Sequence, residues 1–187
     1  MKTVAVVYGW AEGAWQSRRF IESLNRAGFK ITDNVENADI IFAHSAGCFL
    51  VPKTAKAKLI VLAGLPYWPG RNIVSGVIRK LINELRYHRR NKGLGWWANK
   101  MMHNGWYILT KPQKTYFLLT RHKTGNLPAG DNPKVVLLRA SDDTMLHPQT
   151  MKLLPEAQRY QFVELDGAHD DCWLEPKAYV DLLLKEL

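Results

Sequence analysis

Short runs of apolar and β-branched residues recur along the 187-residue chain, and each run is bounded by glycine, proline or polar residues. Runs that are apolar at successive positions are typical of strands buried on both faces of a sheet. They predict five strands, over residues 3–8, 40–43, 58–63, 134–139 and 160–165.

Helical patterns separate these runs. Their predicted ranges are 17–27, 47–55, 149–154 and 176–187. In the first range, Phe20, Ile21 and Leu24 fall on one side of a helix. Strands that alternate with helices predict a mostly parallel sheet with helices on both faces, so the expected fold class is α/β.

The segment 66–130 breaks this alternation. Residues 72–90 carry apolar side chains at the i, i+3, i+4 spacing of an amphipathic helix, and glycines and Pro112 then separate shorter helices. We therefore predict a helical cap over 66–130, inserted into a core made of residues 1–65 and 131–187.

The charge is concentrated in the predicted cap. The chain has 26 Lys and Arg against 17 Asp and Glu, a net charge of +9, and 12 of the basic residues but a single acid lie within 66–130. Aromatic pairs such as Trp96-Trp97 and Trp106-Tyr107 lie in the same segment. This asymmetry predicts an anionic partner, either an anionic or amphiphilic substrate or an anionic membrane surface, and we do not expect nucleic acid. The simpler alternative is that the apolar face of the helix predicted over 72–90 packs on the core, while the basic side chains on its other face are solvated.

Composition and the cysteines exclude several classes of protein. Hydrophobic residues make up 47% and charged residues 23% of the chain, which excludes disordered, collagen-like and coiled-coil proteins. Cys48 and Cys172 are far apart and belong to no CxxC pair, so we expect neither a disulfide scaffold nor a zinc site. No apolar run reaches the roughly 18 residues of a membrane span. The first apolar run leads into Gly9 without a small-residue cleavage site, so we expect a strand and a cytoplasmic protein rather than a signal peptide.

A candidate nucleophile follows the second predicted strand. The sequence Ala43-His44-Ser45-Ala46-Gly47 ends that strand and opens a helical pattern. A serine on such a sharp strand-to-helix turn exposes its Oγ, and the residues two before and two after it must be small because the backbone is crowded there. Ala43 departs from the usual G-x-S-x-G pattern but remains small. We predict Ser45 as the nucleophile.

An acid and a histidine follow in the order that this nucleophile needs. Asp142 and Asp143 come directly after the strand predicted at 134–139, and His169 lies in the loop after the strand predicted at 160–165. Because the carboxyl ends of parallel strands meet at one edge of a sheet, Ser45, Asp143 and His169 can converge there.

Other assignments stay open for parts of this site. Asp142 is an alternative to Asp143, and Asp170 or Asp171 could hold the histidine instead. The N–H groups of Trp10 and Ala46 are the candidates for an oxyanion hole. The substrate pocket is predicted to be lined by His44, Trp68, Trp96 and Trp97.

Four motifs together resemble the α/β-hydrolase superfamily. Tyr8-Gly9-Trp10 resembles the family's His-Gly-x, 43–47 its nucleophile elbow, 141–143 its acid turn and 167–169 its histidine loop. Small bacterial lipases are similar in having alanine at the first elbow position. The resemblance implies a chain shortened at its N-terminus, which begins at the strand leading to the oxyanion loop. It also favours Asp143 over Asp142, because the family places its acid a few residues before a proline.

The resemblance implies a reaction as well as a fold. Relatives that attack with aspartate include haloalkane dehalogenases and epoxide hydrolases, so a serine implies acyl transfer to water without a metal or organic cofactor. We expect hydrolysis of a carboxylic ester, as by an esterase or lipase, with a small acyl compound as substrate. Thioester or amide hydrolysis is the alternative, and from another class, a noncatalytic scaffold that binds an anionic partner through the cap.

Overall fold

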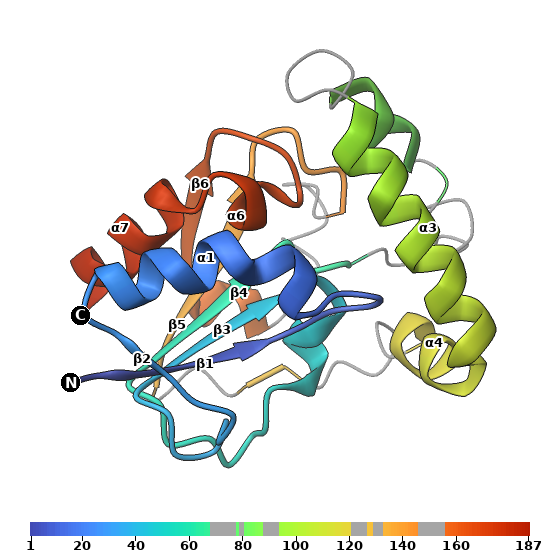
Figure 1. Ribbon diagram of the computed structural model, residues 1–187. Helices are drawn as coiled ribbons and strands as arrows, with labels where there is room; N and C mark the ends of the chain where they lie inside the picture. The colour runs from blue at the N-terminus through green and yellow to red at the C-terminus, as the bar shows by residue number, and fades with distance from the viewer. Residues whose placement is uncertain (68–77, 79–80, 88–93, 121–126, 129–132, 146–155) are drawn as a thin grey trace.

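The computed structural model describes residues 1–67, 78, 81–87, 94–120, 127–128, 133–145 and 156–187 (Figure 1). Its core is a six-stranded sheet in the order β2-β1-β3-β4-β5-β6, and every adjacent pair is parallel. The strands are β1 (Thr3–Val7), β2 (Lys30–Ile31), β3 (Ile40–His44), β4 (Leu59–Ala63), β5 (Lys134–Ala140) and β6 (Gln161–Leu165). The predicted α/β fold with a parallel sheet is therefore confirmed.

The five predicted strands correspond to β1, β3, β4, β5 and β6. Every residue of β3 and β4 is buried, which explains why these strands are apolar at successive positions rather than at alternate ones. Sequence analysis missed β2, because its two residues, Lys30 and Ile31, are too short a run to show a pattern.

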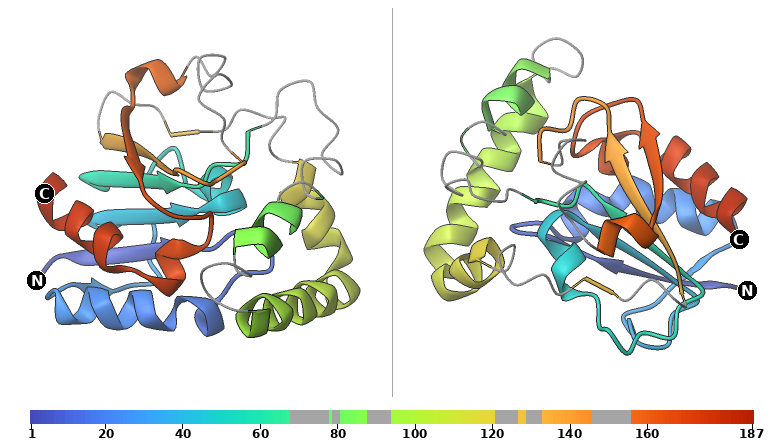
Figure 2. Two further views of the ribbon diagram at one scale, coloured as in Figure 1. Left: turned by 90° about the horizontal axis from the view of Figure 1, so that it is seen from above. Right: turned by 180° about the vertical axis from the view of Figure 1, so that it is seen from behind.

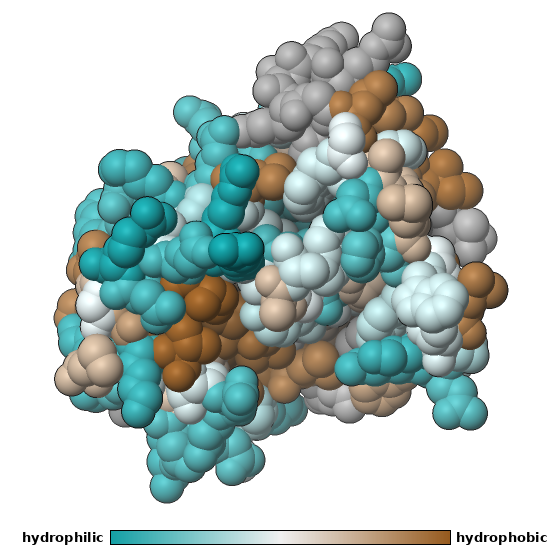
Figure 3. All heavy atoms as spheres, viewed as in Figure 1, coloured by the Kyte–Doolittle hydropathy of each residue, from teal (hydrophilic) through white to brown (hydrophobic). Residues whose placement is uncertain are grey.

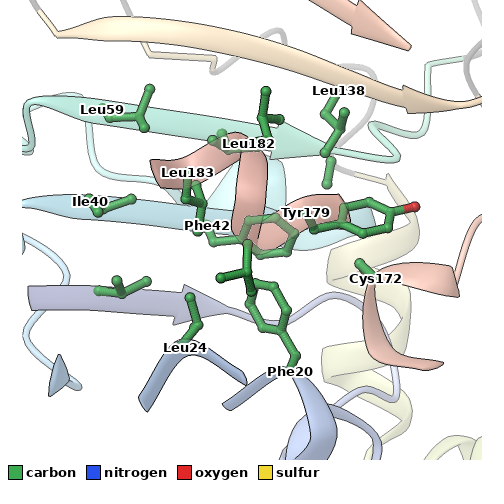
Figure 4. Packing of buried hydrophobic residues seen from close by; sticks show 14 of the residues in the cluster. Phe20, Leu24, Ile40, Phe42, Leu59, Leu138, Cys172, Tyr179, Leu182 and Leu183 are labelled. Atoms are coloured by element: carbon green, nitrogen blue, oxygen red, sulfur yellow. The ribbon is translucent and has the colours of Figure 1, made fainter. Parts of the chain in front are cut away.

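Three helices cover one face of the sheet, namely α1 (Ala14–Arg26), α6 (Asp171–Leu174) and α7 (Lys177–Glu186) (Figures 1 and 2). Figure 4 shows their side chains packed against those of β3 and β4. Phe20 of α1 and Leu183 of α7 are completely buried there, as is Phe42 of β3. Burying a side chain of this size contributes about 1.5–3 kcal/mol to stability. The apolar side of the first predicted helix is thus its core-facing side.

The opposite face of the sheet is packed against the short 3₁₀ helix η1 (Ser45–Leu50) and the segments around it. The helix predicted over 47–55 is shorter than expected because Val51 is extended, the conformation that a residue before a proline prefers, and Pro52 follows it. A second 3₁₀ helix, η3 (Glu156–Arg159), precedes β6. The helix predicted at 149–154 lies outside the described residues. Cys48 and Cys172 are free and buried.

More helices separate β4 from β5 in the chain. Residues 81–87 are helical, and α3 (Leu94–Thr110) and α4 (Pro112–Thr120) follow. Both α3 and α4 lie beside the sheet at the carboxyl ends of its strands (Figures 1 and 2). We call these three segments the cap helices. The remainder of the helix predicted at 72–90 lies outside the described residues, apart from the helical Ile78, and the division into core and cap stays a prediction. Within the described part of the chain, no helix combines the length and the apolar character needed to cross a membrane.

Candidate active site

Ser45 lies at the turn where β3 ends and η1 begins. Its φ is 54°, in the left-handed region that costs about 1–2 kcal/mol for a residue other than glycine. The residue is only 5% exposed, so its backbone is held in this conformation by the surrounding structure. A strained serine at a strand-to-helix turn is the local geometry of a nucleophile elbow.

The small residues around Ser45 allow the elbow to pack against the end of β1. A Cβ on Gly47 would lie 2.5 Å from the Val7 carbonyl oxygen, and one on Gly9 would lie 2.8 Å from the Ser45 Cβ. Both distances are shorter than any real contact, so only glycine fits at either position. Ala43, two residues before the serine, is completely buried. The loop after β1 therefore lies directly against Ser45.

The structure places Asp143, and not Asp142, against His169. The His169 Nδ1 lies 2.8 Å from the Asp143 Oδ2, and both side chains are buried. The other carboxylate oxygen accepts the Met145 N–H at 2.7 Å, which fixes the orientation of the acid. Because a carboxylate only accepts hydrogen bonds, it keeps the proton on Nδ1 and leaves Nε2 as the basic nitrogen. Among the described residues, the buried Nε2 has no hydrogen-bond partner.

Backbone hydrogen bonds beyond β5 and β6 explain this choice of acid. The Ser141 N–H donates to the Leu165 carbonyl and the Asp142 N–H to the Gly167 carbonyl, each at 2.8 Å. These bonds continue the pairing of the two strands into the loops. The Asp142 side chain is exposed, whereas Asp143, the next residue, is buried beside the histidine.

Gly64, at the end of β4, is a site residue that sequence analysis missed. Its φ is +59°, and a Cβ there would lie 2.7 Å from the His169 Cε1 and 3.2 Å from the Asp143 Oδ2. Any side chain would displace the acid–histidine pair. The available signal was a glycine directly after a buried apolar run, which marks a position where the backbone approaches another group closely.

Asp170 and Asp171 do not hold His169 but bind the cap helices. Asp170 pairs with the Lys100 ammonium of α3, which also lies 3.0 Å from a Glu84 carboxylate oxygen. Asp171 accepts the Tyr87 hydroxyl at 2.6 Å. Burial alone would lower the pKa of Lys100, but the two carboxylates raise it above its usual value, so this buried lysine stays charged. The residues after His169 are thus tied to the cap helices by charge-assisted hydrogen bonds.

The cap helices also contact the loop after β1. The Trp10 indole Nε1 donates to the Thr115 hydroxyl of α4 at 3.2 Å. In the first turn of α1, the Trp15 ring stacks on His103 of α3 with centroids 4.1 Å apart. The loop that carries the candidate oxyanion donor therefore contacts α4, and the residues beside the candidate base contact α3.

Two of the three tryptophans predicted to line the substrate pocket lie among the described residues. Trp96 and Trp97, in the first turn of α3, are half-buried, and the Lys100 ammonium lies 5.5 Å from the Trp96 ring centroid. Trp68 lies outside the described residues. Their role in binding substrate stays a prediction.

His44 was predicted to be a wall of the pocket, and the structure gives it a different place. Its ring is completely buried, with Nδ1 2.7 Å from a Glu12 carboxylate oxygen and Nε2 2.8 Å from the His169 carbonyl oxygen. The other Glu12 oxygen accepts the Gly9 N–H at 2.7 Å. Protein groups thus occupy both ring nitrogens, and His44 connects the loop after β1 with the loop of His169. Sequence analysis missed Glu12 because no motif includes it.

The hydrogen bonds of His44 identify its charge state. The His169 carbonyl oxygen only accepts, so Nε2 carries a proton, and with an ionised Glu12 carboxylate facing Nδ1 the ring is an imidazolium. Burial alone would lower the pKa of His44, but the Glu12 carboxylate beside Nδ1 favours the charged ring and raises the pKa. The Cys172 thiol is neutral near pH 7, because burial raises its pKa to about 11. Glu12 and His44 therefore form a buried ion pair.

One group of described residues could offer ligands to a metal ion, namely Glu12, His44, His169 and Asp170, whose ligand atoms lie within 4.8 Å of one another. Protein atoms already engage them, because Glu12 binds His44, Asp170 binds Lys100 and the Nδ1 of His169 binds Asp143. An added cation would have to displace the Lys100 ammonium or the His44 imidazolium. The chemistry of this group therefore fits a hydrogen-bonded network better than a metal centre.

Comparisons with known proteins bear on the fold. No protein-family model matches the sequence, and a search of curated proteins also found no match. Solved structures do resemble it. A bromoperoxidase from Bacillus anthracis superposes with a TM-score of 0.68 at 15% identity, over 98% of this chain and 90% of that one.

Two further structures are similar over almost the whole chain. The thioesterase domain from the curacin biosynthetic pathway superposes with a TM-score of 0.66 at 11% identity, over 98% of this chain and 91% of that one. An extracellular α/β-hydrolase from a Paenibacillus species superposes with a TM-score of 0.57 at 15% identity, over 99% and 98%. Together with the strained elbow and the parallel sheet, these similarities show that the protein has the α/β-hydrolase fold.

Proposed function

We propose that this protein is a serine hydrolase that cleaves carboxylic esters through an acyl-enzyme on Ser45. The observation that carries the proposal is the buried Asp143–His169 pair, whose second imidazole nitrogen is left unbonded by the described residues. A core polar nitrogen without a partner costs stability, and a catalytic base needs such a nitrogen. The strained backbone of Ser45 supports the same assignment.

In the proposed reaction, His169 Nε2 takes the proton from the Ser45 hydroxyl as Oγ attacks the acyl carbon. The proton then passes to the leaving alcohol. A water molecule, deprotonated by the same histidine, next attacks the acyl-enzyme, and the carboxylic acid is released as the proton returns to Ser45 Oγ. Asp143 holds the imidazole in the tautomer that this transfer needs and stabilises the imidazolium that forms.

The oxyanion that forms during attack needs donors from the two loops beside Ser45. We assign the backbone N–H groups of Ala46, directly after the serine, and of Trp10 to this role. The Gly9 N–H is already donated to Glu12, so the amide of the next residue is the candidate in this loop. The Trp10–Thr115 hydrogen bond supports the loop from the cap side.

Thioesters are the second candidate substrate. A solved thioesterase domain has a similar structure, and the same nucleophile, base and oxyanion donors would serve either acyl group. Turnover of matched acetyl and butyryl esters and thioesters distinguishes the two, and the larger kcat/KM identifies the preferred acyl link.

A fluorophosphonate probe tests the proposal directly. We expect covalent labelling at Ser45, none in Ser45→Ala, and full labelling in a Ser23→Ala control on α1. Ser45→Ala should lose hydrolysis of p-nitrophenyl acetate almost completely, leaving only about 10³–10⁴-fold catalysis over water, while its unfolding transition stays cooperative. A folded wild-type protein that takes up no probe, or a Ser45→Ala variant with full turnover, would support the noncatalytic scaffold instead.

A further inference from the structure

In helix α3, two polar side chains are turned toward the protein and three apolar side chains toward solvent. Lys100 and Asn104, which lie on one side, are 4% and 7% exposed. Met102, Trp106 and Leu109, on the other side, are 68%, 69% and 78% exposed. Their spacing of four and three residues places them on one face of the helix. We call these three side chains the apolar stripe. At these five positions the usual orientation of an amphipathic helix is reversed.

The reversed orientation has a local cause. Lys100 is held inside by Glu84 and Asp170, and these contacts fix which face of α3 is turned inward. The apolar stripe is left on the surface, and Figure 3 shows hydrophobic side chains gathered along α3 at the edge of the molecule. Tyr116 and Phe117 of α4 are exposed as well. Clustered exposed apolar side chains of this size mark an interaction site.

The charges of α3 and α4 indicate the chemistry of the partner. Residues 94–120 contain no Asp or Glu, and their lysines are Lys100, Lys111 and Lys114. The buried Lys100 is neutralised by its two carboxylates, so the exposed Lys111 and Lys114 carry the positive charge of this surface. A second copy of this chain would bring the same lysines against each other, and the net charge of +9 opposes that approach.

We propose that α3 and the start of α4 bind an anionic lipid surface, with the apolar stripe among the acyl chains and the two lysines at the headgroups. Leucine and methionine suit acyl chains, whereas the stacking platforms of nucleic-acid proteins are aromatic. Tryptophan is favoured at the depth where headgroups meet acyl chains, which fits Trp106 in the middle of the stripe. The helix would lie in the interface, since no described helix can cross a membrane. This proposal is independent of the chemistry at Ser45.

Co-sedimentation of the 187-residue chain tests the proposal, with vesicles of phosphatidylcholine alone and vesicles that also contain phosphatidylglycerol. We expect binding to the second kind only, weakened by added salt. The double variant Trp106→Ser/Leu109→Ser should lose about tenfold or more in affinity, because interfacial binding scales with buried apolar area. Lys111→Gln/Lys114→Gln should lose about fivefold per lysine.

Matched controls separate this surface from general stickiness and from catalysis. Leu184, 51% exposed on α7, provides the apolar control Leu184→Ser, and Lys2→Gln/Lys30→Gln provides the basic control. Both controls, and Ser45→Ala, should bind as wild type. Equal binding to both vesicles, no binding at low salt, or a stripe variant that binds normally would overturn the proposal. A dimer in light scattering that the stripe variant dissociates would assign the surface to a second copy and would also overturn it.

Discussion

Replacing Glu12 should show whether the buried ion pair with His44 holds the two loops of the site together. Glu12→Ala removes the acceptor of the Gly9 N–H and of the His44 Nδ1–H, bonds of 2.7 Å each. It also leaves a buried imidazolium without its counterion. Removing one partner of a buried pair costs about 3–5 kcal/mol. His44 can relieve part of that cost by losing its proton. We therefore expect the free energy of unfolding to fall by about 3 kcal/mol, which lowers the melting temperature by roughly 6–12 °C in a chain of this size.

Glu12→Gln is the matched control, because glutamine can keep the whole chain of hydrogen bonds in neutral form. Its oxygen accepts the Gly9 N–H, its amide donates to the Nδ1 of a neutral His44, and the His44 Nε2–H still donates to the His169 carbonyl. We expect Glu12→Gln to lower the free energy of unfolding by only about 1 kcal/mol at neutral pH, because neutral hydrogen bonds replace charged ones.

The pH dependence distinguishes a charged pair from a merely well-packed one. The pKa of His44 is raised in the folded protein, so its contribution is complete below its unfolded-state pKa of about 6.5 and is lost as pH rises through the folded-state pKa. The stability of the wild type relative to Glu12→Gln should therefore fall by up to about 1.4 kcal/mol per pH unit over that range.

Urea unfolding followed by circular dichroism measures this difference at pH values from 6 to 9. This range begins just below the usual histidine pKa of about 6.5 and extends well above it. The His169 ring, 4.6 Å from His44, is present in both proteins, and burial raises the pKa of the Cys172 thiol to about 11, above this pH range. Parallel pH profiles for the wild type and Glu12→Gln, or equal losses for Glu12→Ala and Glu12→Gln, would refute the ion pair.

Three further predictions concern other contacts of the site. Asp143→Asn should lower kcat for p-nitrophenyl acetate by about 10⁴-fold while Asp142→Asn changes it little, and equal losses would contradict the assignment of the acid. Gly47→Ala should destabilise the protein or displace the elbow, because its Cβ would lie 2.5 Å from a backbone oxygen, and a soluble variant with wild-type melting and turnover would disprove that packing. Lys100→Met leaves two buried carboxylates facing each other, so amide hydrogen exchange in residues 94–110 should accelerate while the sheet stays protected, and unchanged exchange there would show that Lys100 does not anchor α3.

The sequence by itself determined the parallel sheet and the loops that meet at its edge. Apolar β-branched runs identify buried strands, and parallel strands bring their carboxyl ends together, so Ser45, His169 and an acid at 142 or 143 could be predicted to lie at one edge of the sheet. Only the tertiary structure decided between neighbouring acids, because the pairing of β5 and β6 continues into the loops and buries Asp143 while Asp142 faces solvent.

The orientation of α3 and the place of His44 also needed the tertiary structure. Periodicity shows which residues of a helix share a face, but it does not show which face is turned inward. For α3, the partners of Lys100 decide this, and Glu84 and Asp170 lie 16 and 70 residues away in the sequence. The His44 ring is held by Glu12 and by the His169 carbonyl, 32 and 125 residues away. Polar contacts between such distant residues leave no local pattern, because each depends on where the fold brings the other partner.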